Sequence, residues 1–396
     1  MNGIVKPLGL GACLLLAGIG NGAASVNPVP TALSPDQPPS AASIIETPAD
    51  KAMLFETTEL ARQIWRRLTD DFVTLYQQGQ YRQAERVALR ARDVASAAFG
   101  GNDVDTGDSL LKLGVVSQSL DRLDTAEAYL LQALAILERR LSPDHPDIAI
   151  TLTNLGNVRF SLGDFQSSGR YHRRALQIRR NAYGPEHPSV AQSTYNLGVL
   201  HEHLGHFPLA QTLYRDAINI WTKTLGPGHR YVGNAMSSLV NTHVALDELE
   251  QATGVLRQWV ETNKSFYGGG HSQVVRALLD LGTLYVEQGR YRDAGKTYEE
   301  ALAIAEQLLD PADPQLAMMM YTLANVYHVQ ARRGESGATL ARALPLYVKA
   351  AAILDVDGHH NQSALEIVLS ELALLYQTLG NQDMASRTQS RLTMPR

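Results

Sequence analysis

The sequence contains one cysteine, few aromatic side chains and little surplus of either charge. The cysteine, Cys13, lies near the N-terminus, so the rest of the chain forms no disulfide and packing has to stabilise it. Aromatic residues make up 7% of the chain and the formal net charge is −5. Because proteins that bind nucleic-acid phosphates carry an excess of Lys and Arg, this balance predicts no nucleic-acid partner.

Motifs of common active sites are also missing from the sequence. It has no Gly-rich phosphate loop, no G-x-S-x-G turn and no H-E-x-x-H zinc pair. Adjacent acids such as Glu299 and Glu300 are interpreted as solvated charge on a helix surface. We therefore expect a protein that is not an enzyme and that needs no cofactor.

The one pronounced apolar run, residues 8–19, is too short to span a bilayer as an ordinary helix, which takes about 20 residues. Lys6 precedes it and small residues follow it, up to Ala24 and Ser25. A charged start, a short apolar core and small residues are typical of a secretory signal. We predict that residues 1–24 are a signal peptide and that the protein is periplasmic or secreted.

Two interpretations of Cys13 remain open. It is either an incidental residue of the signal, or the lipidated cysteine of a lipobox formed by residues 10–13. The first is favoured because the apolar run continues beyond Cys13, whereas a lipobox cysteine normally ends such a run. Residues 25–50 are rich in Pro, Ala and Ser and have few large apolar groups to bury, so we expect a flexible tether there.

The remaining chain repeats with a period of 42 residues. Leucine recurs at this spacing from Leu113 to Leu323, and small residues and histidines recur in the same register. The leucines are Leu113, Leu155, Leu197, Leu239, Leu281 and Leu323, and the histidines are His145, His187, His229 and His271, which we interpret as structural residues at the starts of helices. The register slips once, where seven extra residues between 332 and 340 predict a longer turn between two helices.

Each period reads as a helix, a tight turn, a second helix and a short loop. In one copy, apolar residues at helical spacing end at Gly163, and a second helix is expected from Phe165 to Tyr183. Gly156 is small where the second helix approaches. Pro188 then stands at the first turn of the next helix, where its missing N–H costs nothing.

These residues resemble the tetratricopeptide repeat. The match is best at Leu152–Gly156 and Gly184–Pro188, which look like the longer kinesin-light-chain variety of that repeat. The resemblance implies an all-α fold, a right-handed α-solenoid of about eight helical hairpins over residues 51–396, closed by a short C-terminal capping helix. Such a fold usually binds a partner peptide in a concave groove lined by the first helices.

A stripe of polar residues beside the packed stripe of the first helices is the predicted peptide-binding site. Asparagine both donates and accepts hydrogen bonds, so it can hold a peptide backbone without requiring one side chain. The resemblance also points to asparagines as backbone clamps. The predicted site residues are Asn154, Asn157, Ser161, Asn196, His203, Asn241, Asp280, Glu287 and Asn325. The alternative is that these are simply polar residues on solvated helix faces.

Metal binding is not expected at the histidine-rich stretch around His201 and His203. A helical metal pair needs ligands four residues apart on one face, whereas these two are two residues apart. His201 also occupies the position of Tyr285 in a later repeat, which indicates a packing role.

The sequence therefore predicts an exported scaffold that captures a peptide segment of a partner protein. Two alternatives stay open: a self-assembling structural protein whose outer helices carry the contacts, and an accessory subunit of a cell-envelope machine, anchored through lipidated Cys13. The oligomeric state is left open, and a stable oligomer would favour self-assembly.

Overall fold

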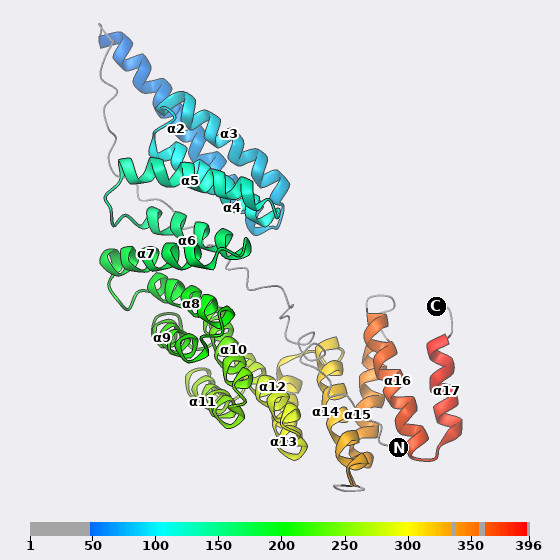
Figure 1. Cartoon of the computed structure of the whole chain (residues 1–396). Helices are drawn as coiled ribbons and strands as arrows, with labels where there is room; N and C mark the ends of the chain where they lie inside the picture. The colour runs from blue at the N-terminus through cyan, green and yellow to red at the C-terminus, as the bar shows by residue number, and fades with distance from the viewer. Residues whose placement is uncertain (1–47, 335–337, 356–360, 394–396) are drawn as a thin grey trace. The chain divides into compact units, whose positions relative to one another are not determined.

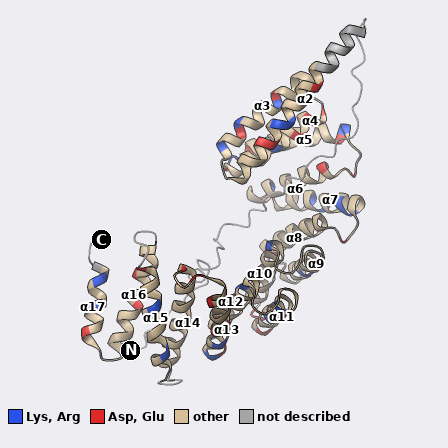
Figure 2. Ribbon diagram, turned by 180° about the vertical axis from the view of Figure 1, so that it is seen from behind, with Lys and Arg blue, Asp and Glu red and all other residues tan. Residues whose placement is uncertain are grey.

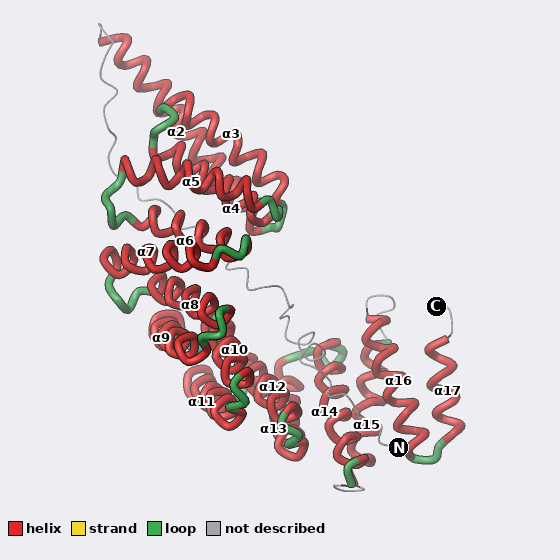
Figure 3. The backbone as a smooth tube through the Cα atoms, in the orientation of Figure 1, coloured by secondary structure: helices red, strands yellow, loops and turns green. Residues whose placement is uncertain are grey.

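The computed structural model describes residues 48–334, 338–355 and 361–393, and these ranges contain α-helices and no strands (Figures 1 and 3). The helices are α2 (Pro48–Gln77), α3 (Tyr81–Phe99), α4 (Val104–Ser119), α5 (Leu123–Arg140), α6 (Pro146–Ser161), α7 (Phe165–Tyr183), α8 (Pro188–His203), α9 (Phe207–Leu225), α10 (Arg230–Ala245), α11 (Leu249–Tyr267), α12 (Ser272–Glu287), α13 (Tyr291–Leu308), α14 (Pro314–Arg332), α15 (Ala338–Leu354), α16 (Gln362–Thr378) and α17 (Gln382–Thr393). The predicted signal peptide, Cys13 and most of the predicted tether lie outside these ranges. The all-α prediction is confirmed.

The helices follow one another as hairpins, in the predicted order of helix, tight turn, helix and short loop. The second helix of the copy analysed above, α7, has the predicted bounds. By contacts, the described residues divide into two compact units. The N-terminal unit comprises the described residues up to 224, and the C-terminal unit comprises those from 225 onwards.

Histidines begin four of the first helices, as their recurrence predicts. At His145, His187, His229 and His271, Nδ1 accepts a hydrogen bond from the backbone N–H two residues later, at 3.1 to 3.3 Å. Asp103 and Asp313 make the same cap at α4 and α14. This bond satisfies one of the amides that a helix N-terminus leaves without a partner. The recurring histidines are therefore structural.

Within a hairpin, a small residue of the first helix lies against a large side chain of the second. A Cβ at Gly156 would lie 2.6 Å from the ring of His172, and one at Gly282 would collide with Tyr298. The expected role of Gly156 in close approach is thus confirmed. The large side chains stand one repeat apart and are all buried: Leu130, His172, Tyr214, Leu256 and Tyr298. They form the centre of each hairpin's core.

The seven extra residues that the sequence places between 332 and 340 belong to the hairpin of α14 and α15. They are partly helical and do not form only a longer turn. First helix α14 has 19 residues, whereas α12 has 16. Ala331 and Arg332 favour helix and extend it, until Gly334, with φ of 77°, allows the chain to turn. Residues 335–337 lie outside the described ranges.

Candidate functional site

The three predicted site residues on α6 differ in depth. Asn154 is 1% exposed, Asn157 is half-buried and Ser161 is exposed. On α8, Asn196 is 3% exposed while His203 is exposed. Each helix therefore carries one deeply placed amide, with more accessible polar groups one or two turns further along.

The deep amides each keep one polar atom without a partner. Asn154 Nδ2 donates to the carbonyl of Ile150 at 2.9 Å, but its Oδ1 has no hydrogen-bond partner among the described residues. Asn196 Oδ1 accepts from Gln192 Nε2 at 2.9 Å, and its Nδ2 has no partner within the same ranges. Since buried polar atoms are nearly always paired, these two amides stand out.

In the C-terminal unit the predicted residues lie on three helices. Asn241 and Glu287 are exposed, whereas Asp280 and Asn325 are half-buried. Burial raises the pKa of Asp280 to about 6, and its Oδ2 has no hydrogen-bond partner in the described part of the chain. Asn325 Oδ1 accepts a hydrogen bond from Tyr347 on α15, so this amide is committed to its own hairpin.

Histidines at the end of α8 pack against neighbours. The ring of His203 lies 5.1 Å from that of Phe160 and 4.6 Å from that of Phe165, measured between centroids. His201 Nδ1 lies 3.2 Å from His206 Nδ1, so one imidazole donates and the other accepts. Within the described residues no group of three or more His, Cys, Asp or Glu side chains is arranged to hold a metal ion.

Two buried acids of the N-terminal unit escaped the prediction. Asp108 forms an ion pair with Lys112, which stands one repeat before Asn154. The pKa of Asp147 is raised to about 6, mainly by burial, while the charge of His145 lowers it and that of Asp108 contributes to the rise. The signal that could have identified them is the row of polar residues at the position of Asn154, which begins with Lys112. Asp108 lies one helical turn before Lys112, and Asp147 lies two turns before Asn154.

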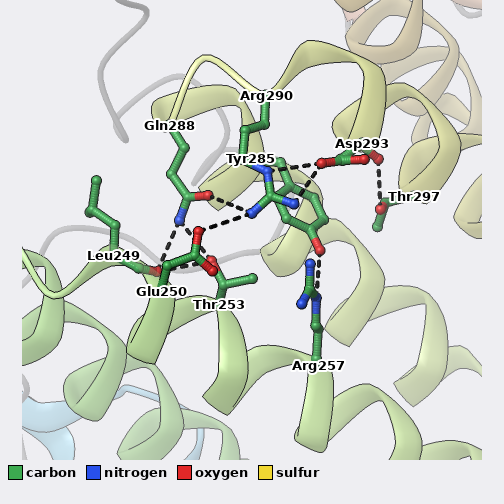
Figure 4. Close-up of polar contacts among 9 residues, drawn as sticks. All are labelled: Leu249, Glu250, Thr253, Arg257, Tyr285, Gln288, Arg290, Asp293 and Thr297. Atoms are coloured by element: carbon green, nitrogen blue, oxygen red, sulfur yellow. Dashed lines mark hydrogen bonds and ion pairs between the residues drawn. The ribbon is translucent and has the colours of Figure 1, made fainter.

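A second polar cluster, in the C-terminal unit, also went unpredicted (Figure 4). Arg290 pairs with Asp293 at 2.6 Å and lies over the ring of Tyr285, 4.6 Å from its centroid. Arg257 Nε donates to Tyr285 Oη at 2.8 Å, and Gln288 Nε2 donates to Thr253 Oγ1 at 2.7 Å. These side chains link α11, α12 and α13, and their donors and acceptors are paired with one another. The cluster is therefore structural.

A model of the tetratricopeptide repeat family matches most of the described chain. The matched segments are residues 73–139, 108–168, 147–220, 260–307 and 273–349, which together cover more than half of the sequence. A search of curated proteins finds no match. Within the described ranges no helix combines the length and the apolar character that crossing a bilayer requires.

Solved structures with similar folds include repeat proteins of several kinds. TPR-like repeats of a kinesin light chain from Podosopora anserina are 20% identical, with a TM-score of 0.42 over 54% of this chain and 95% of that one. BtubC (BKLC) from P. vanneervenii is 22% identical, with a TM-score of 0.42 over 60% and 93%. The quorum sensor NprR from B. thuringiensis is 16% identical, with a TM-score of 0.41 over 85% and 98%. At these scores the likenesses carry no argument about function.

Proposed function

The chain belongs to the tetratricopeptide repeat family, and on that premise we propose that it is an exported, non-catalytic scaffold that binds a segment of a partner protein along its first helices. The observation that carries the proposal is a row of polar residues, one per repeat, on these helices. The row consists of Lys112, Asn154, Asn196, Ser238, Asp280 and Thr322.

Stability does not explain this row. Each member directly precedes a buried leucine, from Leu113 to Leu323, yet each is polar. Asn154, Asn196 and Asp280 keep a buried polar atom without a hydrogen bond in the described residues, which costs about 1 to 3 kcal/mol for each group. A peptide backbone supplies both N–H and C=O groups along its length, so it can complete these hydrogen bonds when the side chains turn toward it.

Recurrence distinguishes the row from a local accident. Asn263, on second helix α11, has the same arrangement as Asn154: its Nδ2 donates to the carbonyl four residues earlier and its Oδ1 has no described partner. The positions equivalent to Asn263 are Ala95, Leu137, Arg179, Trp221 and Ala305, so a polar residue does not recur there as it does in the row. Asn263 is therefore an isolated core residue and a matched control.

The partner-binding experiment compares Asn154→Ala/Asn196→Ala with Asn263→Ala. We expect the double variant to lose cross-linking to the partner in extract of the compartment where the protein resides, while Asn263→Ala retains it. Each substitution removes one buried polar atom without a partner and adds a better helix former, which offsets the lost hydrogen bonds to Ile150 and Gln192, so the thermal stability of the double variant should change little. Equal capture by all three proteins, in a quantitative mass-spectrometric comparison, would contradict a role for the first helices.

Export is supported by the pattern of residues 1–24, in which a charge, a short apolar run and small residues follow one another. We expect a periplasmic or secreted protein whose N-terminus is Ser25. Mass spectrometry of the protein purified from its own cells tests this. An intact N-terminus would refute cleavage, and a lipidated Cys13 would indicate a membrane-anchored accessory subunit instead.

A further inference from the structure

Second helices α3 and α7 of the N-terminal unit carry arginines at equivalent positions. Arg86 and Arg90 on α3 stand two repeats before Arg170 and Arg174 on α7, and all four are exposed. Arg82 extends the α3 row by one turn. Helix α7 has five arginines and no Asp or Glu, which Figure 2 shows as blue segments without red. We call Arg82, Arg86, Arg90, Arg139, Arg170 and Arg174 the arginine face.

The α3 row does not stabilise its own helix. Arg82, Arg86 and Arg90 follow one another at intervals of four residues, so their like charges repel on one side of the helix. Among the described residues, none of the three has a hydrogen bond or an ion pair of its side chain. A row that repels itself and has no partner within the fold is suited to an external anion.

Helix α5, which lies between them in the chain, presents a mixed surface and has Asp124 at the position of Arg82. Its residues at the positions of Arg86 and Arg90 are Ala128 and Gln132, and Leu131 beside them is 42% exposed. Ion pairing of Arg174 with Glu138, at 2.5 Å, holds α7 against α5. The face thus combines the arginines of α3 and α7 with an exposed apolar side chain of α5.

A cavity of about 360 Å³ opens between α3 and α5. Arg92 and Arg139 stand at it, Ser96 and Gln132 add polar groups, and Leu110 and Ile136 supply apolar lining. Arg139 has no side-chain partner among the described residues, whereas Arg92 pairs with Asp93. The cavity is large enough for one apolar side chain beside a carboxylate.

We propose that the arginine face binds an acidic segment of a protein, a second contact independent of the first-helix row. Guanidinium groups bind carboxylates through two parallel hydrogen bonds, which explains arginine rather than lysine at these positions. The apolar lining of the cavity favours a peptide over a lipid surface, because a peptide brings an apolar side chain between its carboxylates whereas headgroups present only charge.

The test uses the full chain and a fluorescein-labelled heptapeptide of glutamates with one central leucine. Fluorescence anisotropy at 50 mM NaCl should detect binding that weakens steeply with salt. The variant Arg82→Gln/Arg86→Gln should bind at least fivefold more weakly. The control Arg292→Gln/Lys296→Gln removes two charges at the equivalent positions of α13 and should change binding less than twofold. Replacing the central leucine with serine should weaken binding about threefold.

Circular dichroism shows whether the arginine variant remains folded, and its helicity should equal that of the wild type. Equal losses in the two double variants would overturn the proposal, since net charge alone would then govern binding. The proposal also fails if the wild type ignores the peptide, or if it binds vesicles of anionic phosphatidylglycerol more tightly than the peptide. These results leave the first-helix experiment untouched, so the two proposals can fail separately.

Discussion

Helices α3 and α13 occupy equivalent places in the repeat but handle charge in different ways. Where α3 has Arg82, Arg86 and Arg90, α13 has Arg292, Lys296 and Glu300. Glu300 pairs with Lys264 on α11 at 2.9 Å, so α13 uses this position to join neighbouring hairpins. The α3 row makes no such contact among the described residues. The same exposed stripe of the repeat is therefore available either for internal pairing or for an external ligand.

The two units also differ at the centre of their hairpins. His172 in the N-terminal unit and Tyr298 in the C-terminal unit fill the same position against a glycine. Burial lowers the pKa of His172 to about 3, with a smaller contribution from the charge of Arg179. Tyr298 has no group that titrates at acidic pH. The N-terminal unit therefore contains a core position that depends on pH.

The largest expected effect on stability comes from adding a Cβ at the glycines against which these large side chains pack. Gly282→Ala should destabilise the C-terminal unit by about 2 to 3 kcal/mol, since its Cβ would collide with Tyr298. Gly156→Ala should cost less, about 1 to 2 kcal/mol, because an imidazole is smaller than a phenol. Urea unfolding followed by circular dichroism measures both.

The control for these variants is Gly254→Ala on α11, where an added Cβ has no atom within 4 Å. This change should stabilise the protein by about 1 kcal/mol through helix propensity. If Gly156→Ala and Gly282→Ala lowered stability no more than Gly254→Ala does, the close packing of the hairpins would not depend on the glycines.

The stability of the two units should depend on pH in different ways, because of His172 in the N-terminal unit. Because its folded pKa is depressed from 6.5 to about 3, the stability from neutral His172 is complete above pH 6.5 and is lost as the pH falls toward 3. The free energy of unfolding of His172→Leu, relative to that of the wild type, should therefore rise by about 1.4 kcal/mol for each unit by which the pH falls between 6 and 4. Thermal unfolding at a series of pH values measures the difference.

Asp105 and Asp147, whose pKa values burial raises to about 6, titrate in both proteins, so their contributions cancel in that comparison. Tyr298→Leu serves as the matched variant of the C-terminal unit. Its stability relative to the wild type should be the same at pH 6 and pH 4. A gain for His172→Leu that did not grow with acidity would contradict a neutral buried imidazole.

The smallest expected effect concerns the exposed charges. Arg290→Gln breaks the ion pairs to Asp293 and Glu250, and should destabilise the C-terminal unit by about 0.5 to 1 kcal/mol at low salt. Arg86→Gln should change stability by less than about 0.3 kcal/mol, or raise it, because it removes a like-charge repulsion. Equal losses in thermal midpoint would show that the arginine face is structural after all.

The repeat period allowed the sequence to predict the helices with useful accuracy. The expected bounds of α7, about Phe165 to Tyr183, agree with the structure, because Gly163 and Gly184 end helices and Pro188 begins one, all through local backbone chemistry. Histidine caps also followed from recurrence. The depth of the candidate site did not: Asn154 and Ser161 were placed on one stripe, yet one is buried and the other exposed. Burial depends on how closely the neighbouring first helix packs, which no local pattern records.

By itself the sequence determined the family of the fold and the register in which polar residues recur, since both follow from a 42-residue period and from helix-ending residues. Only the tertiary structure decided which polar atoms lack a partner and which arginines stand alone. Arg86 and Arg290 look alike as residues, yet Arg290 pairs with Asp293 and Glu250 whereas Arg86 has no ion pair in the described part of the chain. What separates these two arginines is the set of side chains that the packing of neighbouring helices brings within hydrogen-bond distance.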